Sequence, residues 1–345
     1  MKFRTLGRTG FTVSEIGYGA WGIGKSMWVG AEDELSLKAL HRAADLGLNF
    51  IDTALAYGNG HSERLVGKFS KERSERIVVA TKIPPKNGHW PARKGTPLRE
   101  AFPAEYIVER TETSLRNLGA DAIDLQQLHV WTDEWTDDGE WYDALSRLRE
   151  QGKVRFFGVS INDHDPASAL RLVGSGKVDT VQVIYNIFDQ SPEAELFPLC
   201  QKMNVGVLAR VPLDEGGLTG SISASSTFPK GDFRNGYFRG SRKRRVAARV
   251  DSLRPLLGAE ASTIAELALK FCLHHEAVST VIPGMRSIKN VEANCAAPDG
   301  RALSAQTVEN LREHRWPRNF YSSALPAPLR PIYRFLKKII QRFRP

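Results

Sequence analysis

The chain has 345 residues, of which 41% are hydrophobic and 25% are charged, a composition typical of globular proteins that bury a sizeable core. This length allows either one large α/β barrel or two ordinary domains. The formal net charge is +9, and six of the positive charges lie within residues 330–345, where there is no acid. The remaining +3 needs no nucleic-acid partner to explain it.

Three other features of the sequence limit which class of protein this can be. No apolar run follows Lys2, and no stretch of about eighteen apolar residues occurs, so neither a signal peptide nor a spanning helix is expected. The cysteines are widely spaced, show no metal-ligand pattern and indicate reduced thiols: Cys200, Cys272 and Cys295. The histidines show no metal-binding spacing either. We therefore expect a cytoplasmic protein without a metal site.

The first predicted elements are two short strands, 3–6 and 11–13, around a glycine-bounded turn. Residues 16–20 predict the next strand, and its glycines would allow close approach of a ligand or another backbone. After a helical pattern at 32–46, residues 48–51 are a short apolar run that predicts a buried strand ending at Asp52.

Asp52 and Tyr57 place a carboxylate and a phenol where a strand stops and a loop begins. In parallel α/β folds, strand ends and the loops after them face one shared crevice, where sites form. Taken alone, the pair equally fits an Asp that caps a turn and a Tyr that covers it. Ser62-Glu63 then predict the start of the next helix.

Two later strand ends add an ammonium and an imidazole. The β-branched run 77–81 ends in Lys82 before a proline pair, and the strand 123–128 ends in His129. Together with the carboxylate and the phenol, these groups are suited to proton transfer that is coupled to hydride transfer onto a carbonyl. A phenol with a pKa near ~10 is a poor acid, but an ammonium held by a carboxylate would lower that pKa, and His129 would orient the carbonyl.

Strand and helix patterns alternate through the rest of the chain. Helices are predicted at 103–118, 140–151, 165–172, 191–203 and 262–274, and strands at 154–160, 180–185, 205–209 and 280–283. With the earlier strands this makes eight βα units, which favours a (β/α)8 TIM barrel over a doubly wound sheet. The basic stretch 242–245 lies in a long segment before the last strand, and a solvated charge run is its simplest interpretation.

The motif Asp52-Thr53-Ala54, Tyr57-Gly58 and Ser62-Glu63, with Lys82 and His129 after later strands, resembles the catalytic tetrad of the aldo-keto reductases. The resemblance extends from about residue 3 to about residue 321 and rests on several separated motifs. It implies a (β/α)8 barrel closed at the bottom by the N-terminal β-hairpin. It also implies an oxidoreductase that transfers hydride from NADPH to an aldehyde or ketone, with Tyr57 as the proton donor and Asp52, Lys82 and His129 as its catalytic partners.

The resemblance also implies which residues bind NADPH or NADP+. They are Gly19, Ala20 and Trp21 at the nicotinamide, Ser160 and Gln182 at its carboxamide, Arg210 beside the ring, Leu213, Gly216, Gly217 and Leu218 at the pyrophosphate, and Gly284, Arg286, Asn290 and Asn294 at the adenosine phosphate. Arg suits a bidentate phosphate contact, so Arg286 favours NADPH over NADH.

Three residues depart from the family pattern. Ile161 replaces an Asn, which removes one carboxamide hydrogen bond unless Asn162 supplies it, and Ala293 replaces a Glu at the adenine end. Arg210 replaces an aromatic residue. Its planar guanidinium could stack on the neutral reduced nicotinamide, or it could instead pair with a carboxylate such as Asp214 or Glu215.

Aromatic residues near strand ends could form an apolar wall over Tyr57 for a small-molecule carbonyl substrate. We expect this pocket to include Trp21, Trp28, Trp131 and Phe188. Trp90 and Trp135 fit a pocket and ordinary packing equally well. The aromatic content suggests a bulky apolar or aromatic carbonyl compound.

The sequence predicts one barrel domain, 1–322, followed by a proline-containing basic tail, 323–345. Apolar residues at 332, 335, 336, 339, 340 and 343 share one face of a predicted helix at 331–344. Such a helix either packs on protein or lies on an anionic membrane surface. No pattern predicts an oligomeric state.

Two other functions remain open at this level. Proteins of this fold can bind NADPH as regulatory or redox-sensing subunits with little turnover. A barrel lyase or aldolase would instead use Lys82 to form a Schiff base and would need no nicotinamide.

Overall fold

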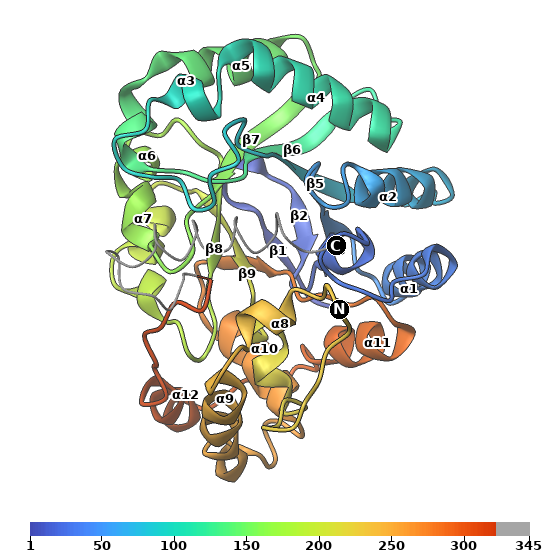
Figure 1. The fold of residues 1–345 in the computed structure, drawn as a ribbon, viewed down its shortest axis with the longest axis vertical. Coiled ribbons are helices and arrows are strands. Elements are labelled where there is room, and N and C mark those ends of the chain that lie inside the picture. The colour runs from blue at the N-terminus through green and yellow to red at the C-terminus, as the bar shows by residue number, and fades with distance from the viewer. Residues whose placement is uncertain (322–345) are drawn as a thin grey trace, which may run out of the picture.

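The structure, a computed structural model, describes residues 1–321 and has a parallel eight-stranded sheet at its centre (Figure 1). Each strand pairs with the next one along the chain. The strands are β3 (Tyr18–Gly19), β4 (Phe50–Asp52), β5 (Val78–Ile83), β6 (Ile123–Leu128), β7 (Val154–Ser160), β8 (Thr180–Ile184), β9 (Gly206–Arg210) and β10 (Val278–Val281). All eight strands predicted from the sequence are present.

The two ends of the sheet meet, so the sheet closes into a barrel. Parallel bridges join Ile16 to Val281 and Gly19 to Gly284. The Gly17 amide donates to the Val281 carbonyl at 2.8 Å, and the Gly19 amide donates to the Pro283 carbonyl at 3.0 Å. A Cβ on Gly19 would lie 2.8 Å from the Ile282 carbonyl oxygen, so a glycine is required where the seam closes.

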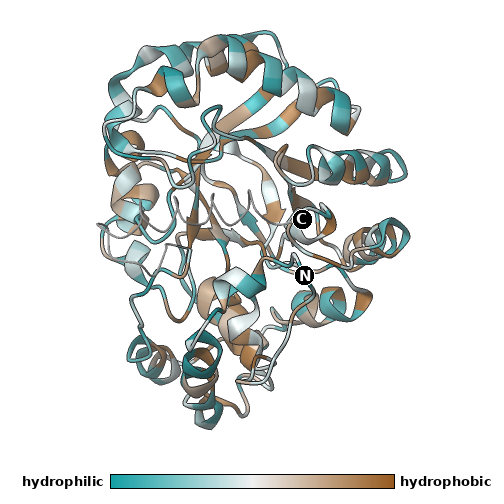
Figure 2. Ribbon diagram, viewed as in Figure 1, coloured by the Kyte–Doolittle hydropathy of each residue, from teal (hydrophilic) through white to brown (hydrophobic). Residues whose placement is uncertain are grey.

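Helices surround the barrel, and apolar residues concentrate on the strands while the outward helix faces are polar (Figure 2). This pattern follows from burial of each helix's apolar stripe against the sheet. The helices are α1 (Asp33–Asp45), α2 (His61–Lys71), α3 (Leu98–Ala101), α4 (Ala104–Leu118), α5 (Gly139–Glu150), α6 (Leu170–Gly174), α7 (Leu196–Lys202), α8 (Arg234–Tyr237), α9 (Arg242–Asp251), α10 (Ile264–His274), α11 (Ile288–Ala296) and α12 (Ala305–Arg312).

Two predicted helices are shorter than expected. The patterns at 165–172 and 191–203 begin as 3-10 turns, and α6 and α7 form only after them. Pro166 and Pro192 lie in those first turns, where a proline removes a backbone donor.

The N-terminal hairpin closes the bottom of the barrel. Strands β1 (Phe3–Thr5) and β2 (Thr12–Ser14) pair antiparallel, and Leu6 and Val13 pack with barrel residues such as Leu208 in one buried cluster. The Arg8 amide donates to the Asn204 carbonyl at 2.7 Å, just before β9 begins. The opposite, carboxyl-terminal end of the barrel is therefore the open one.

The predicted tail, 323–345, and its helix at 331–344 lie outside the described residues. The division into a barrel domain and a tail accordingly stays a prediction. Among the helices of residues 1–321, none combines the length and apolarity needed to cross a bilayer.

Candidate active site

Three neighbouring strands bring Asp52, Lys82 and His129 to the open end of the barrel. Asp52 ends β4, Lys82 lies near the end of β5, and His129 follows β6. Lys82 is completely buried, and its Nζ donates to Asp52 Oδ2 at 2.6 Å and to the Thr53 carbonyl at 2.9 Å. Lys82 Nζ is also 3.4 Å from the Tyr57 hydroxyl. The structure thus places the ammonium between the carboxylate and the phenol.

Gln182 and His129 complete the surroundings of this group. Gln182 Nε2, from β8 on the far side of the barrel, donates to the other Asp52 oxygen at 2.7 Å. The His129 ring lies edge-on to the Tyr57 ring, with centroids 5.7 Å apart. Its buried Nδ1 has no hydrogen-bond partner within residues 1–321. The four predicted tetrad residues are therefore adjacent in space.

The loop that carries Tyr57 is fixed from two sides. Gly58 has a φ of +67°, and a Cβ there would lie 1.9 Å from the Gly24 carbonyl oxygen, so the Tyr57 loop packs tightly on the loop after β3. Ser62 Oγ, which accepts from Thr53 Oγ1 at 2.8 Å, donates to the Ala20 carbonyl at 3.0 Å. The Ser62-Glu63 motif is therefore structural, and it holds the turn rather than taking part in chemistry.

Electrostatics at the site correct one expectation from the sequence. Burial and the Asp52 carboxylate raise the pKa of Tyr57 well above its usual value, so Lys82 does not make the phenol more acidic in this state. Burial lowers the pKa of Lys82, although Asp52 opposes this shift. Burial, Lys82 and Arg210 hold the pKa of His129 well below its usual range. At neutral pH the site therefore presents a protonated phenol and a neutral imidazole.

Such an arrangement can donate a proton to a polar oxygen. The Tyr57 hydroxyl keeps its proton until an acceptor develops negative charge, and the ammonium 3.4 Å away would then stabilise the phenolate left behind. The neutral His129 ring beside the phenol can hold the same acceptor by a hydrogen bond.

Arg210 ends β9 and pairs with an acid that was not expected. Its Nη2 donates to Asp163 Oδ1 at 2.8 Å and to the Ile161 carbonyl at 2.9 Å. Arg210 therefore pairs with a carboxylate, as one of the two alternatives had it, but the carboxylates named as examples, Asp214 and Glu215, are engaged elsewhere. Asp163 lies in the loop after β7, and nothing in the sequence marks it as the partner of a residue 47 positions away.

The turn after β9 forms a buried polar cluster. Asp214 accepts from the Tyr237 hydroxyl at 2.8 Å and pairs with Arg318, while Glu215 accepts from the Tyr321 hydroxyl. Burial raises the pKa of Glu215 to about 7.

The same turn also bears on the predicted pyrophosphate site. The Gly216 and Leu218 amides both donate to the Leu213 carbonyl at 2.9 Å, so neither points to a ligand. Gly217 and Leu218 are also buried. In this conformation of the turn both amides are already bonded, and the assignment of Gly216 and Leu218 to the pyrophosphate stays a prediction.

The other predicted cofactor residues follow the seam of the barrel and the strands opposite it. Gly19 and Gly284 are bridged, Ala20 and Trp21 come directly after β3, and Ser160 pairs in register with Gln182. Asn162 does not take over the role of the Asn that Ile161 replaces. Its side-chain amide is already bonded to the Ala92 backbone, at 2.9 and 3.2 Å.

The residues after β10 leave room and a donor for a ligand. No atom lies within 4 Å of a Cβ built on Gly284, and the buried Asn294 Nδ2 lacks a partner within the described chain. Arg286 Nη1 donates to the Val29 carbonyl at 2.7 Å, and the Asn290 amide is capped by Ser287 at 3.3 Å. The phosphate end of a dinucleotide fits this region. It could use the unpaired Asn294 side-chain amide, the space beside Gly284 and the half-buried Arg286 near the N-terminus of α11.

Aromatic rings line the space next to Tyr57, but they are not all the expected ones. Trp21 stacks beside Tyr57 with centroids 6.1 Å apart, and Trp28 lies 5.7 Å from Trp21. Trp131 and Phe188 are fully buried, and their assignment to the substrate pocket stays a prediction. Trp131 packs against Trp135 and Trp141 behind β6, and Phe188 packs against Trp316.

Two further aromatic residues lie at the site: Trp90, for which the sequence left pocket and packing equally open, and Phe233, which the sequence did not single out. Trp90 is half exposed and lies edge-on to the His129 ring at 4.5 Å, and Phe233 lies 5.0 Å from Trp21. The Phe233 amide donates to the Met27 carbonyl at 2.7 Å, which joins the long segment after β9 to the loop after β3. The only sequence signal for these residues was their position in long loops after strands.

Comparison with known proteins agrees with this geometry. The model of the Aldo/keto reductase family matches residues 15–315. The aldo-keto reductase YhdN of Bacillus subtilis (strain 168) is 32% identical over 298 residues, which cover 85% of this chain and 87% of YhdN. The NADH-specific methylglyoxal reductase of Escherichia coli (strain K12) is 32% identical over 312 residues, which cover 86% of this chain and 93% of that protein.

A solved structure shows the same fold. It is an aldo/keto reductase from Klebsiella pneumoniae in complex with NADP and acetate, with 27% sequence identity and a TM-score of 0.66. The match covers 92% of this chain and 98% of that one.

Proposed function

Because the chain belongs to the aldo/keto reductase family, it is an oxidoreductase that acts on carbonyl compounds, and we propose that it reduces an aldehyde or ketone with NADPH while Tyr57 donates the proton. The observation that carries the proposal is the buried series Gln182, Asp52 and Lys82, which ends 3.4 Å from the Tyr57 hydroxyl. Bound NADPH would supply a hydride to the carbonyl carbon. The residues at the site provide the proton and the orientation.

In the proposed reaction Tyr57 transfers its proton to the carbonyl oxygen as that oxygen gains charge. Lys82 then lies next to a phenolate, and its ammonium compensates that charge, while Asp52 keeps Lys82 charged and in place. The neutral imidazole of His129 holds the carbonyl oxygen near the phenol. The product is an alcohol, and solvent returns the proton to Tyr57.

The two alternative functions have less support. A regulatory subunit would not require the complete set Asp52, Tyr57, Lys82 and His129, and named reductases are among the similar proteins. A Schiff-base mechanism needs a free amine, but Lys82 Nζ is fully buried and already donates to Asp52 and Thr53.

The test is loss of NADPH absorbance with a panel of aromatic and aliphatic aldehydes and ketones. Tyr57→Phe should lower kcat by about 10²-fold or more, because it removes the proton but keeps the ring. Tyr142→Phe, on the outer helix α5, is the matched control and should retain native kcat. NADPH binding without oxidation of any substrate would contradict the reductase proposal.

Preference for NADPH is proposed from Arg286. Its guanidinium is half buried after β10, where a 2′-phosphate could form a bidentate contact. Arg286→Met should raise the Kd for NADPH at least about tenfold, the equivalent of ~1.4 kcal/mol, and leave the Kd for NADH nearly unchanged. Lys289→Met removes the same charge from an exposed position on α11 and should affect neither Kd. Equal Kd values of the native protein for the two cofactors would contradict the preference.

A bulky apolar or aromatic substrate is proposed from the rings around Tyr57. Trp21 and Phe233 lie on one side and Trp90 on the other, next to His129. Trp90→Ala should therefore raise KM for aromatic aldehydes more than KM for short aliphatic ones. Equal changes in KM for the two classes of aldehyde would contradict the preference for a bulky aromatic substrate.

The C-terminal tail, 323–345, is proposed as a contact segment for protein or membrane. Support comes only from its sequence, with six basic residues and apolar residues at helical spacing. Sedimentation with liposomes separates the two: equal pelleting of the intact chain and a chain ending at Leu329 would exclude the membrane contact.

A further inference from the structure

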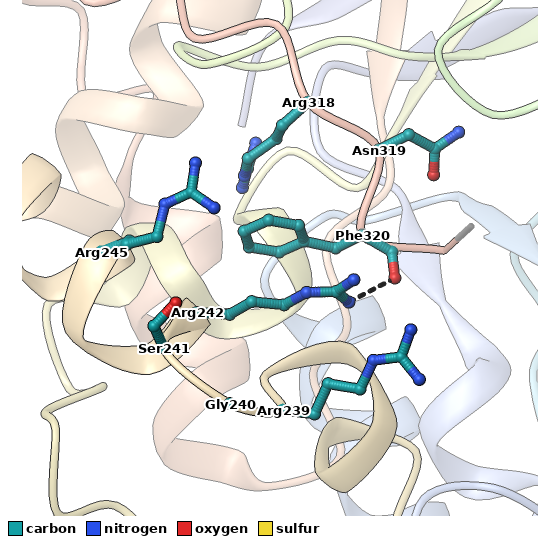
Figure 3. Close-up of a pocket in the computed structure, with 8 residues that line it drawn as sticks. All are labelled: Arg239, Gly240, Ser241, Arg242, Arg245, Arg318, Asn319 and Phe320. Carbon is teal, nitrogen blue, oxygen red and sulfur yellow. Dashed lines mark hydrogen bonds between the residues drawn. The ribbon is translucent and has the colours of Figure 1, made fainter. Parts of the chain in front are cut away.

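A dense group of arginines lies on α9 and the turn before it. We call this group the arginine surface, and it consists of Arg239, Arg242, Arg244, Arg245 and Arg249. All except Arg242 are exposed. With Arg318 and the Phe320 ring, three of them border a depression of about 540 Å³ (Figure 3).

The arginine surface lacks counter-charges. None of its five members forms an ion pair within residues 1–321, whereas Arg234, Arg301 and Arg318 are each paired with an acid. Arg242 donates only to carbonyl oxygens, those of Tyr237 at 2.9 Å and Phe320 at 2.7 Å. Burial and the neighbouring arginines lower the pKa of Arg242, as mutual repulsion of the cations requires. An anionic partner would relieve that repulsion.

The geometry keeps these charges on one outer side of the molecule. Val246 and Val250 form the buried face of α9 together with Arg242, whereas Arg244, Arg245 and Arg249 are exposed on its surface. The Arg245 and Arg249 guanidinium groups lie 5.1 and 5.4 Å from the Trp316 ring centroid, which limits their motion. None of the five belongs to the tetrad or to the predicted cofactor residues.

The chain itself does not supply the missing anion. The nearest described end is Tyr321, directly after Phe320, and the residues beyond it, 322–345, contain six basic residues and no acid. Like charges do not neutralise one another, so this segment is an unsuitable occupant. The sequence of 322–345 also has apolar residues at helical spacing, and such a composition suits a surface with anionic headgroups and an apolar interior.

We propose that the arginine surface docks the protein on an anionic lipid bilayer. The four exposed cations of this surface supply the electrostatic attraction. A bilayer fits better than a small phosphate ion, which one or two guanidinium groups would satisfy. Contact through arginines spread along a helix face requires an extended anionic surface.

The test is co-sedimentation of the full chain with phosphatidylcholine vesicles that contain either no phosphatidylserine or about 30% of it. The native protein should pellet with the anionic vesicles and not with the neutral ones, and binding should fall steeply between about 0.1 and 0.5 M salt. The triple variant Arg244→Gln, Arg245→Gln, Arg249→Gln should lower the partition coefficient by about 100-fold, at about 1 kcal/mol for each charge. This triple variant leaves residues 322–345 unchanged, so a loss of vesicle binding would be caused by the removed arginines of α9.

The matched control is Arg99→Gln, Arg116→Gln, Arg147→Gln. These exposed arginines lie on α3, α4 and α5, at the opposite end of the molecule from α9 (Figure 1), and their loss changes the net charge equally. The control should bind nearly as the native protein does. The proposal is overturned if both triple variants bind equally, if neutral vesicles bind as well as anionic ones, or if duplex DNA at the same salt outcompetes the vesicles. Thermal melting checks that each variant is folded.

Discussion

Lys82 shows how strongly single residues are constrained at this site. It is an ion-paired lysine with no exposed surface, and a buried charge without its partner is costly in free energy. Asp52 has both oxygens occupied, one by Lys82 and one by Gln182. The position of the phenol therefore depends on a network drawn from three strands, and changes to any member should affect both stability and activity.

Glu215 should make the stability of the protein depend on pH. Its pKa is about 7 in the folded state and near ~4.3 when unfolded, so unfolding between these values releases a proton. Protonated Glu215 therefore stabilises the folded state. This contribution to the free energy of unfolding, up to about 3 kcal/mol, is fully present below about pH 4 and is lost as the pH rises to 7. Glu215→Gln keeps a partner for Tyr321 but does not titrate. Urea unfolding from pH 5 to 7.5 should show a smaller decline in this variant.

The control for this prediction is Glu195→Gln, an exposed residue that should retain the native slope. Asp214 also has a raised pKa and remains in both variants, so the decline should shrink rather than vanish. An unchanged slope in Glu215→Gln would contradict the assignment of the proton to this carboxyl.

Arg210 should discriminate between oxidised and reduced cofactor. If its guanidinium lies beside the nicotinamide, it repels the cationic oxidised ring and tolerates the neutral one. Arg210→Met should therefore lower the ratio of the Kd for NADP+ to the Kd for NADPH, by up to about tenfold. Asp163→Asn removes the partner of Arg210 at 2.8 Å and should raise the same ratio. Fluorescence titration measures both, and shifts in the same direction would refute the account.

At the scale of secondary structure, the hairpin that closes the bottom of the barrel depends on one glycine. Gly7 has a φ of +49°, and a Cβ there would lie 2.2 Å from the Gly206 amide nitrogen. Gly7→Ala should lower the free energy of unfolding by at least about 2 kcal/mol more than Gly10→Ala, which has a positive φ but no neighbour within 4 Å. Denaturant unfolding of both variants measures the difference, and equal losses would show that the close contact costs nothing.

The elements of the fold were predictable because hydrophobic periodicity records them. All eight barrel strands and the main outer helices follow their patterns. The tetrad follows because Asp52, Lys82 and His129 lie at or next to strand ends and Tyr57 lies in the loop directly after one of these strands. The side chains in long loops were not predictable in this way. Trp131 comes three residues after β6, but only the packed structure shows that it turns to Trp141 instead of Tyr57. The pairing of Arg210 with Asp163 likewise depends on how two loops meet.

At the scale of the whole molecule, cofactor binding should be linked to unfolding. The predicted cofactor residues come from both ends of the closed sheet, so an unfolded chain cannot assemble them. NADPH at about 100 times its Kd should raise the free energy of unfolding by about 2.7 kcal/mol, and the melting temperature by several degrees. Arg286→Met should lose most of this gain at the same concentration. No shift with NADPH in the native protein, measured by calorimetry, would contradict the cofactor assignment.

The seam between β3 and β10 also has a consequence for synthesis of the chain on the ribosome. His129 is synthesised long before Gly284, and at translation rates of roughly 5–20 residues per second the interval lasts about eight to thirty seconds. During that time the nascent sheet has two unpaired edges, which favour association with other chains. The catalytic groups are therefore synthesised early, but the barrel around them closes only near the end of translation. A chaperone that covers the unpaired sheet edges would be most useful during that interval.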